Sequence, residues 1–215
     1  MSPRRLLWGL SAGVVGVLFF LLVGFKILYR LRAQLGKPMP CPAAWAWTLD
    51  LDPRRRAIPQ VLDRVGIQPG ERVLELGTGP GVYTVEAARR VGPEGRLIGV
   101  DIQPEMIAYA DQRVQSAGLT NVETRVADAH DLPIEDGNLD RIFLVAVLAE
   151  IPDQDGLMLE LRRVLRPGGT LSITEEFPDP DYLFAFEVIR RAERGGFTFE
   201  QRFGNFWQYT VNFTR

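Results

Sequence analysis

The nine residues VLELGTGPG (73–81) decide the fold. The short apolar run 72–76 leads into three glycines at alternate positions, and an amphipathic segment follows from Val82. Glycines permit a tight turn and close approach to a ligand, and a helix beginning there presents free N–H groups. A strand, a glycine loop and a helix are therefore predicted. The spacing G-x-G-x-G differs from the dinucleotide fingerprint G-x-G-x-x-G, and no Gly-Lys-Ser/Thr follows to form a P-loop.

On either side of this loop, strand-sized apolar runs alternate with longer amphipathic runs. This order predicts a doubly wound, mostly parallel sheet covered by helices on both faces. Gly118 and the run Pro167-Gly168-Gly169 are typical of helix ends. The further strands are expected at 96–101, 122–126, 140–145 and 170–174, and the helices at 82–91, 104–117, 153–165 and 182–194.

The carboxyl-terminal part of the sequence departs from this alternation. The segments FTFEQRF (197–203) and FWQYTVNF (206–213) alternate in polarity around Gly204-Asn205. Such a pattern predicts a tight antiparallel hairpin. The expected fold class is therefore α/β, with a parallel sheet that finishes in an antiparallel pair.

Three acids follow the first three expected strands or lie in them. Asp101 ends the second strand, where a carboxylate accepts hydrogen bonds from both hydroxyls of a ribose. Asp128 follows the third strand and is a candidate acceptor for an adenine amino group, whereas Glu75 is placed to meet an ammonium group. Helix capping by Asp101 and a turn role for Asp128 are the structural alternatives.

Four motifs occur in order: VLELGTGPG (73–81), GVDIQPEMI (99–107), VADAHDLP (126–133) and LRRVLRPGGTLSITE (161–175). Together they resemble the motifs of class I S-adenosylmethionine-dependent methyltransferases, particularly those that methylate quinones and lipids. The resemblance covers roughly residues 58 to 215. It implies a seven-stranded sheet with a reversed terminal hairpin.

The resemblance also implies a cofactor, S-adenosyl-L-methionine, and the residues that hold it. The alternative for the glycines is that they serve only to build the turn and bind nothing. The implied residues are Glu75, Gly77, Gly79 and Gly81 at the methionine end, Asp101 at the ribose, Asp128 and Ala129 at the adenine, with Thr78 and Ile102 beside them.

A sulfonium methyl is already electrophilic, so the protein needs to align the acceptor, exclude water and remove a proton where required. Glu150, after the fourth strand, is the candidate for a base or an orienting group, with a merely solvated role as the alternative. His130 is a possible second base, and the alternatives are that it lines the adenine-side loop or is simply exposed. The apolar residues Tyr182, Leu183, Phe184 and Phe186 suit either a pocket wall or ordinary core packing.

The segment Leu6–Phe25 holds twenty consecutive uncharged residues. At about 1.5 Å per residue, it would span the roughly 30 Å hydrocarbon core of a bilayer. A retained single-pass transmembrane helix is the favoured interpretation, and a cleaved signal peptide or a buried core helix are the alternatives. The flanking charges favour a catalytic domain on the cytoplasmic side of the cell membrane.

The predicted division is an anchor with a basic flank (1–32), a linker rich in proline, tryptophan and arginine (33–57) and the methyltransferase domain (58–215). Residues 1–32 carry a charge of +5, whereas residues 66–215 carry −9. The basic neck suits an anionic membrane surface, with Trp45 and Trp47 either at lipid headgroups or packed on the domain. The acidic body argues against nucleic acid as a partner.

One cysteine, Cys41, and one histidine exclude an intramolecular disulfide framework and a zinc site of Cys and His ligands, and no metal ligand cluster is recognised. Arsenite methylation, an activity of some relatives, relies on several thiols. The predicted function is therefore methyl transfer to a small hydrophobic or lipid-like acceptor at the membrane. The alternative is a noncatalytic, membrane-tethered protein that binds the cofactor or a partner. The oligomeric state stays open.

Overall fold

The computed structural model describes residues 24, 41–46, 53–177, 179 and 181–215. One seven-stranded sheet, in the order β3-β2-β1-β4-β5-β7-β6, forms its centre. The first five strands are parallel, and β7 runs antiparallel between β5 and β6. The strands are β1 (Arg72–Leu76), β2 (Arg96–Asp101), β3 (Val122–Val126), β4 (Leu139–Val145), β5 (Leu165–Glu176), β6 (Thr198–Gly204) and β7 (Gln208–Thr214).

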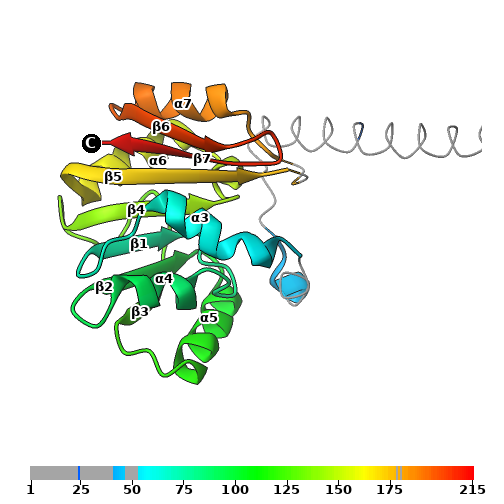
Figure 1. The fold of residues 1–215 in the computed structure, drawn as a ribbon, viewed down its shortest axis with the longest axis vertical. Helices are drawn as coiled ribbons and strands as arrows, with labels where there is room; N and C mark the ends of the chain where they lie inside the picture. The colour runs from blue at the N-terminus through cyan, green and yellow to red at the C-terminus, as the bar shows by residue number, and fades with distance from the viewer. Residues whose placement is uncertain (1–23, 25–40, 47–52, 178, 180) are drawn as a thin grey trace, which may run out of the picture.

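Helices cover both faces of the sheet (Figure 1). The pleat directs successive side chains to opposite faces, so that Val73 packs with the α3 and α4 side and Leu74 with the α6 and α7 side. The α-helices are α3 (Ile58–Val65), α4 (Thr84–Val91), α5 (Pro104–Ser116), α6 (Gln154–Val164) and α7 (Ala185–Arg194), and short 3-10 turns are η1 (Ala43–Trp45), η2 (Pro53–Ala57) and η3 (Leu148–Glu150).

The seven-stranded sheet and its terminal hairpin confirm the predicted fold class, with corrections at particular elements. The run Pro167-Gly168-Gly169 is not a helix end but lies inside β5, which begins directly after α6. Gly168 has a φ of +74°, and the pairing with β4 shifts register nearby, so the glycines accommodate a bulge.

Three predicted starts also move. The helix expected from Val82 begins at Thr84, the helix expected from Tyr182 begins at Ala185, and the strand expected from Phe206 begins at Gln208. Tyr182 and Leu183 instead lie in the preceding loop, and their side chains are buried. The amphipathic helix α3, which closes one face of the sheet through Val61, Leu62 and Val65, was not predicted.

The predicted anchor, Leu6–Phe25, lies outside the described residues except for Gly24. Within the part of the chain that is described, the structure contains no helix with both the length and the apolar character needed to cross a membrane. Of the linker, the structure describes 41–46 and 53–57, which contain η1 and η2. The side chains of Trp45 and Trp47 lie outside the description.

Candidate functional site

The glycine loop joins β1 to α4 at the carboxyl edge of the parallel strands. The backbone N–H groups of Gly77 and Thr78 both donate to the carbonyl of Val100 in β2, at 2.8 and 3.0 Å. Gly77, Gly79 and Gly81 all have positive φ, which L side chains rarely adopt. The loop is therefore a fixed turn tied to the neighbouring strand.

The three glycines serve different purposes. A Cβ on Gly77 would lie 2.3 Å from Cγ2 of Val147, and one on Gly81 would lie 3.0 Å from Cα of Ala110. These two glycines therefore allow the chain to pack against itself. A Cβ on Gly79 would meet nothing within 4 Å, so the open side of the loop is at Gly79.

Asp101 ends β2 beside this opening. Its Oδ2 accepts from the backbone N–H of Gly79 at 2.8 Å, and its Oδ1 accepts from that of Gln103 at 3.0 Å. Asp101 thus fixes the turn before α5 and holds the loop at its open position, but it does not cap the helix, because the N-cap of α5 is Gln103 and no side chain caps it. The carboxylate is partly exposed, and each oxygen retains a second lone-pair direction for a ligand hydroxyl.

Glu75 lies beneath the loop and is 4% exposed. Its Oε2 accepts from the hydroxyl of Thr84 at 2.7 Å. Burial raises the pKa of Glu75 to about 8, against the lowering effect of the Thr84 hydroxyl and with a further rise from Asp101. A cation above the loop would favour the ionised form of this carboxyl.

Two predicted cofactor residues differ in orientation. Thr78 is buried, and its hydroxyl donates to the carbonyl of Glu75 at 3.2 Å, so its side chain supports the loop and does not face the opening. Ile102 is 59% exposed directly after Asp101. An exposed isoleucine at this edge offers an apolar surface to a flat ring.

Asp128, Ala129 and His130 occupy the loop after β3. Oδ1 of Asp128 accepts from the backbone N–H of His130 and contacts its Nδ1, both at 2.9 Å. Nε2 of His130 lies 2.8 Å from the carbonyl of Asp153, the N-cap of α6. Burial lowers the pKa of His130, but the Asp153 carbonyl and the Asp128 carboxylate together raise it. Both ring nitrogens are thus engaged, and His130 joins this loop to α6.

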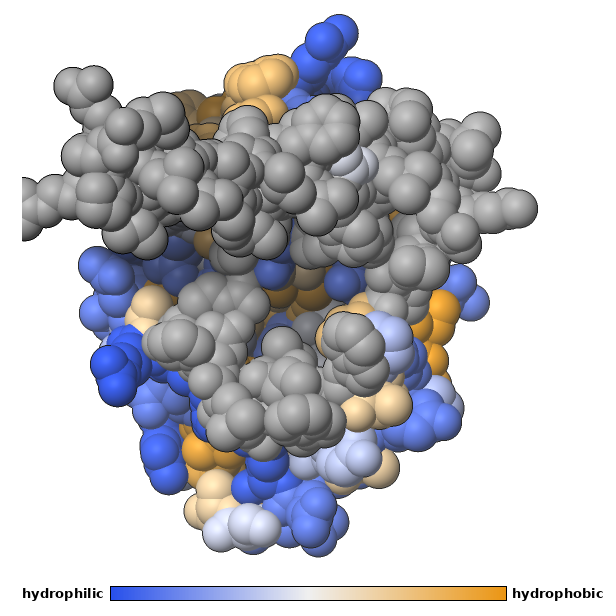
Figure 2. All heavy atoms as spheres, turned by 90° about the vertical axis from the view of Figure 1, so that its right-hand side faces the viewer, coloured by the Kyte–Doolittle hydropathy of each residue, from blue (hydrophilic) through white to orange (hydrophobic). Residues whose placement is uncertain are grey.

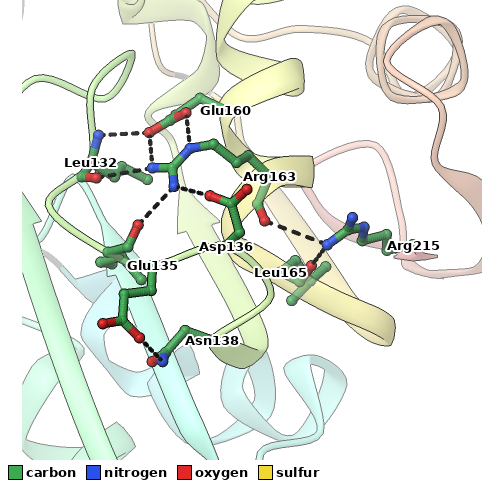
Figure 3. A network of polar contacts seen from close by, with 9 residues as sticks. Leu132, Glu135, Asp136, Asn138, Glu160, Arg163, Leu165 and Arg215 are labelled. Carbon is green, nitrogen blue, oxygen red and sulfur yellow. Dashed lines mark hydrogen bonds and ion pairs between the residues drawn. The ribbon is translucent and has the colours of Figure 1, made fainter.

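The other end of the same loop is held by Arg163, in the motif LRRVLRPGG (Figure 3). Its guanidinium pairs with Glu160 at 2.7 Å and with Asp136 at 2.6 Å. It also donates to the carbonyls of Leu132 and Ile134, while Glu160 accepts from the backbone N–H of Leu132. These contacts position the loop that carries Asp128, a role that sequence reasoning did not assign to Arg163.

Glu150, the candidate base, ends η3 at the carboxyl end of β4. Burial raises the pKa of Glu150 to about 8, with further increases from Asp181 and Asp101. A backbone hydrogen bond from Cys41 opposes this rise. Residue 41 is itself held at this edge, because its carbonyl accepts from Nε2 of Gln103 at 3.1 Å. The loop before Glu150 contains Ala146, whose φ of +54° is strained for a non-glycine residue.

Three buried acids near the end of β5 were missed by sequence reasoning. Glu175 is 2% exposed and accepts from the backbone N–H of Leu183 at 3.3 Å. Burial raises its pKa well above the usual range, opposed by that N–H and reinforced by Asp181. Glu176 accepts from the hydroxyl of Tyr83 and from the side-chain amide of Gln208. Glu175 and Glu176 are the last two residues of β5, and the third acid, Asp181, lies in the loop after it; none of them gave a separate signal in the sequence.

Aromatic rings surround this acidic end of β5. Phe177 lies 5.7 Å from Tyr182, 5.0 Å from Phe206 and 5.2 Å from Trp207, measured between ring centroids. Tyr182 donates through its hydroxyl to the carbonyl of Phe206 at 2.8 Å. Tyr182 and Leu183 therefore belong to the packed interior, whereas Phe184 and Phe186 are exposed.

The carboxyl edge of the sheet thus brings together two groups of residues. Figure 2 views the molecule from this side, where hydrophilic and apolar residues both reach the surface. The first group comes from the ends of β1, β2 and β3 and contains the glycine loop, Asp101, Ile102 and Asp128. The second comes from the ends of β4 and β5 and the β6–β7 turn, and contains Glu150, Asp181 and the aromatic rings. The first group suits a nucleoside with a cationic end, and the second suits an apolar molecule with a titratable atom.

Residues 67–182 match the family described as "Methyltransferase domain". A demethylmenaquinone methyltransferase from Geobacillus stearothermophilus is 32% identical over 129 residues, covering 60% of this chain and 54% of that protein. An arsenite methyltransferase from Halobacterium salinarum is 40% identical over 116 residues, covering 52% of this chain and 30% of that protein. The chain therefore spans from under a third to just over half of the length of these curated relatives.

Solved structures show the same fold. An S-adenosylmethionine-dependent methyltransferase from Aquifex aeolicus has a TM-score of 0.75 and 27% identity, covering 81% of this chain and 98% of that chain. Phosphoethanolamine N-methyltransferase 2 from Haemonchus contortus, in complex with S-adenosyl-L-methionine, has a TM-score of 0.59 and 26% identity, covering 67% of this chain and 37% of that chain.

Proposed function

This chain belongs to the methyltransferase domain family and carries an S-adenosyl-L-methionine-dependent methyltransferase domain, and from that premise we propose that it methylates a small hydrophobic or lipid-like acceptor at a membrane. The observation that carries the proposal is the opening at Gly79, with the Asp101 carboxylate bonded at its rim and the aromatic, acidic end of β5 on the same edge. A donor and an apolar acceptor would meet between them.

The residues around the loop fit S-adenosyl-L-methionine. The cofactor would supply a methyl group on a positively charged sulfur. Asp101 would accept from the ribose hydroxyls, Ile102 would cover one face of the adenine, and Asp128 with Ala129 would lie at its edge. Glu75, buried below the loop with its pKa raised to about 8, would ionise when an ammonium group stands above it.

Glu150 is the proposed proton acceptor. A carboxyl whose pKa is raised to about 8 is a stronger base than an exposed glutamate, and it titrates close to a physiological pH. As the acceptor atom bonds to the methyl group, its proton would pass to Glu150, while the bonding pair stays with the departing sulfur. Burial at this edge would keep water away from the reacting atoms.

A hydrophobic acceptor is supported by three independent facts. Phe177, Phe206 and Trp207 present aromatic surface beside Glu150's end of the sheet. The relative from Geobacillus is named a demethylmenaquinone methyltransferase. The chain also contains twenty uncharged residues at 6–25, whose length suits a membrane anchor. Arsenite is disfavoured as an acceptor, because the chain has one cysteine.

The proposed organisation keeps residues 1–32 as a single-pass anchor with a basic flank, 33–57 as a linker and 58–215 as the catalytic domain on the cytoplasmic side. Two experiments test the function. Calorimetric titration with S-adenosyl-L-methionine should detect binding to the wild-type protein and a loss of about 100-fold or more in Asp101→Ala, since hydrogen bonds to a charged group contribute about 1.5–3 kcal/mol each. Absence of wild-type binding would reject the proposal.

The second experiment separates an enzyme from a noncatalytic cofactor-binding protein. Tritiated S-adenosyl-L-methionine is incubated with the full chain and a membrane lipid extract, with Asp101→Ala as the control. Label in a lipid-soluble product of the wild type alone supports the proposed reaction. Cofactor binding without labelled product in lipid or aqueous fractions would favour the noncatalytic alternative.

A further inference from the structure

Three large aromatic side chains are exposed together at two loop tips. Phe186, in the first turn of α7, is 68% exposed, and Phe206 and Trp207, in the β6–β7 turn, are 49% and 63% exposed. Phe184 connects the two tips, since its ring centroid lies 5.9 Å from that of Phe186 and 6.4 Å from that of Phe206. We call Phe184, Phe186, Phe206 and Trp207 the aromatic tip surface.

The aromatic tip surface rests on a well-bonded base. The backbone N–H of Phe177 donates to the carbonyl of Trp207 at 2.7 Å, and the Tyr182 hydroxyl donates to the carbonyl of Phe206. The Tyr209 hydroxyl also fixes the adjacent loop through the carbonyl of Leu183, at 2.6 Å. The fold thus holds these rings outward at a fixed place, and contiguous exposed apolar surface of this kind marks an interaction site.

This surface lies at the same edge as the candidate site. Gln208, next to Trp207, pairs with Glu176 at the carboxyl end of β5. Cys41 lies at this edge too, because its backbone forms hydrogen bonds with the side chains of Gln103 and Glu150. The uncharged run ends at Phe25, sixteen residues before Cys41, so the chain between them reaches at most about 55 Å. An anchor at 6–25 would hold this edge within reach of the bilayer surface.

Cationic side chains flank the hairpin tip. Nη1 of Arg64 donates to Oε1 of Gln208 at 3.2 Å, and the Arg202 guanidinium lies 5.4 Å from the ring centroid of Tyr209. Aromatic rings favour the membrane–water interface, and arginines beside them are placed to meet lipid phosphates. A patch of rings at loop tips with basic neighbours matches the interface of a bilayer.

We propose that the aromatic tip surface rests in the interfacial layer of the membrane and turns the acceptor side of the site toward the lipid. This inference rests on the proposed membrane-associated function and adds the face by which the domain meets its acceptor. An apolar acceptor would then pass from the bilayer to the end of β5 without crossing bulk water.

The test uses the full chain carrying Cys41→Ser, with single cysteines introduced as Phe186→Cys or Trp207→Cys and labelled with an environment-sensitive fluorophore. Two matched controls are Leu159→Cys and Phe199→Cys. Leu159 lies on α6 and is 65% exposed, and Phe199 lies at the opposite end of the hairpin and is 40% exposed. Each protein is reconstituted into vesicles of phosphatidylcholine and phosphatidylglycerol, with or without lipids carrying brominated acyl chains.

Brominated lipid should quench the probes at 186 and 207 by roughly twofold and leave those at 159 and 199 nearly unchanged, because only interfacial rings approach the acyl chains. Quenching at neither tip position, equal quenching at all four positions or failure of the protein to float with vesicles would each overturn the proposal. The methylation assay with the lipid extract tests the proposed reaction independently of the quenching result. Tip quenching without methyl transfer would support this surface and refute the proposed reaction.

Discussion

The two halves of the carboxyl edge are built in different ways. On the donor half, the glycine loop is fixed by backbone hydrogen bonds from Gly77 and Thr78 to the neighbouring strand β2, and by the Asp101 carboxylate, which accepts from the Gly79 N–H. On the acceptor half, Tyr182 bonds to Phe206 and Tyr209 bonds to Leu183, across 24 and 26 residues of sequence. The donor half therefore depends on local turn chemistry, whereas the acceptor half depends on how the terminal hairpin packs onto the sheet.

This difference indicates where each half tolerates change. A domain that always binds the same cofactor needs the same loop conformation, and a few glycines and acids determine that conformation. An acceptor site that depends on long-range side-chain packing is altered by substitutions in the hairpin or the loop before α7, with the donor half left intact. Substitutions confined to one half should therefore leave the other half unaffected.

The largest effect on stability is expected for Gly77→Ala. Its Cβ would clash with Val147 and its φ of +72° disfavours alanine, so the free energy of unfolding should fall by about 3–5 kcal/mol. Gly79→Ala has the conformational cost without the clash and should lose only about 1–2 kcal/mol, but should weaken cofactor binding at least about tenfold. Urea unfolding and calorimetric titration measure the two effects.

Val147→Ala provides the control for this pair. Combined with Gly77→Ala, it should recover part of the lost stability, because the Val147 side chain is what a Cβ at residue 77 would strike. Combined with Gly79→Ala, it should recover none of the lost affinity, because a Cβ at residue 79 meets nothing. Equal destabilisation by both glycine substitutions would contradict the division of roles within the loop.

Glu150→Gln tests the acceptor half. We expect kcat to fall about 100-fold, a typical contribution from a general base, while the cofactor dissociation constant stays within about twofold. In the wild type, kcat should increase as the pH rises through about 8, where the carboxyl ionises, and the variant should be flat across this range. Glu94→Gln, an exposed position, is the matched control. An unchanged pH profile in Glu150→Gln would exclude Glu150 as the base.

Arg163→Met tests the support of the loop after β3. Removing the guanidinium leaves Glu160 without its ion pair and frees two backbone carbonyls, so stability should decrease by about 2 kcal/mol. Cofactor affinity should also decrease, because the same loop carries Asp128. Arg194→Met, whose exposed pair with Asp155 is worth little, should change stability by less than about 0.5 kcal/mol. Similar losses in both variants would argue against a special role for Arg163.

The protonation of Glu75 links stability to pH. Its pKa is about 8 in the folded chain and 4.5 without the fold, so the folded state binds more protons between these values. Stability should therefore fall as the pH rises through this window, and Glu75→Gln should lessen the fall. Unfolding in urea at pH 5, 6.5 and 8 measures how the free energy of unfolding changes with pH. Saturating cofactor should flatten the wild-type slope if its ammonium group lies against Glu75. A slope that is unaffected by cofactor would place the ammonium elsewhere.

The smallest effect is expected for Ala146→Gly. The φ of +54° is unfavourable for alanine and neutral for glycine, so the folded state should gain up to about 1 kcal/mol, offset in part by the flexibility of glycine in the unfolded chain. Thermal unfolding measures the change. A decrease as large as the full entropic cost of a glycine, roughly 0.5–1 kcal/mol, would show that the left-handed backbone at Ala146 is not strained.

The sequence predicted the donor half better than the acceptor half for a physical reason. Strand β1, its glycine loop and Asp101 carry their own signals, because the chain needs positive φ and a strand-end acid at fixed spacing. By contrast, Glu175 and Glu176 look like the polar end of an ordinary strand, and their burial depends on Leu183, Tyr83 and Gln208, which lie far away in sequence or beyond a loop.

The misplaced run Pro167-Gly168-Gly169 has a similar cause. Proline and glycine signal a break in a helix, and α6 does end three residues before Pro167. The strand continues through these residues because β5 itself bulges at them, between the pairs Leu139–Leu165 and Arg141–Thr170, and because Arg215 forms backbone hydrogen bonds with Gly168 and Gly169. The sequence around Pro167 gives no sign of this pairing, because Arg215 lies far away along the chain.

The position of Arg215 has a practical consequence. Its backbone N–H donates to the carbonyl of Gly169 and its carbonyl accepts from the N–H of Gly168, both at 3.1 Å, at the amino edge of the parallel strands. A purification handle or fluorescent protein fused after Arg215 would therefore emerge on the side remote from the glycine loop. Immobilising the enzyme through such a fusion should leave both substrates free to enter.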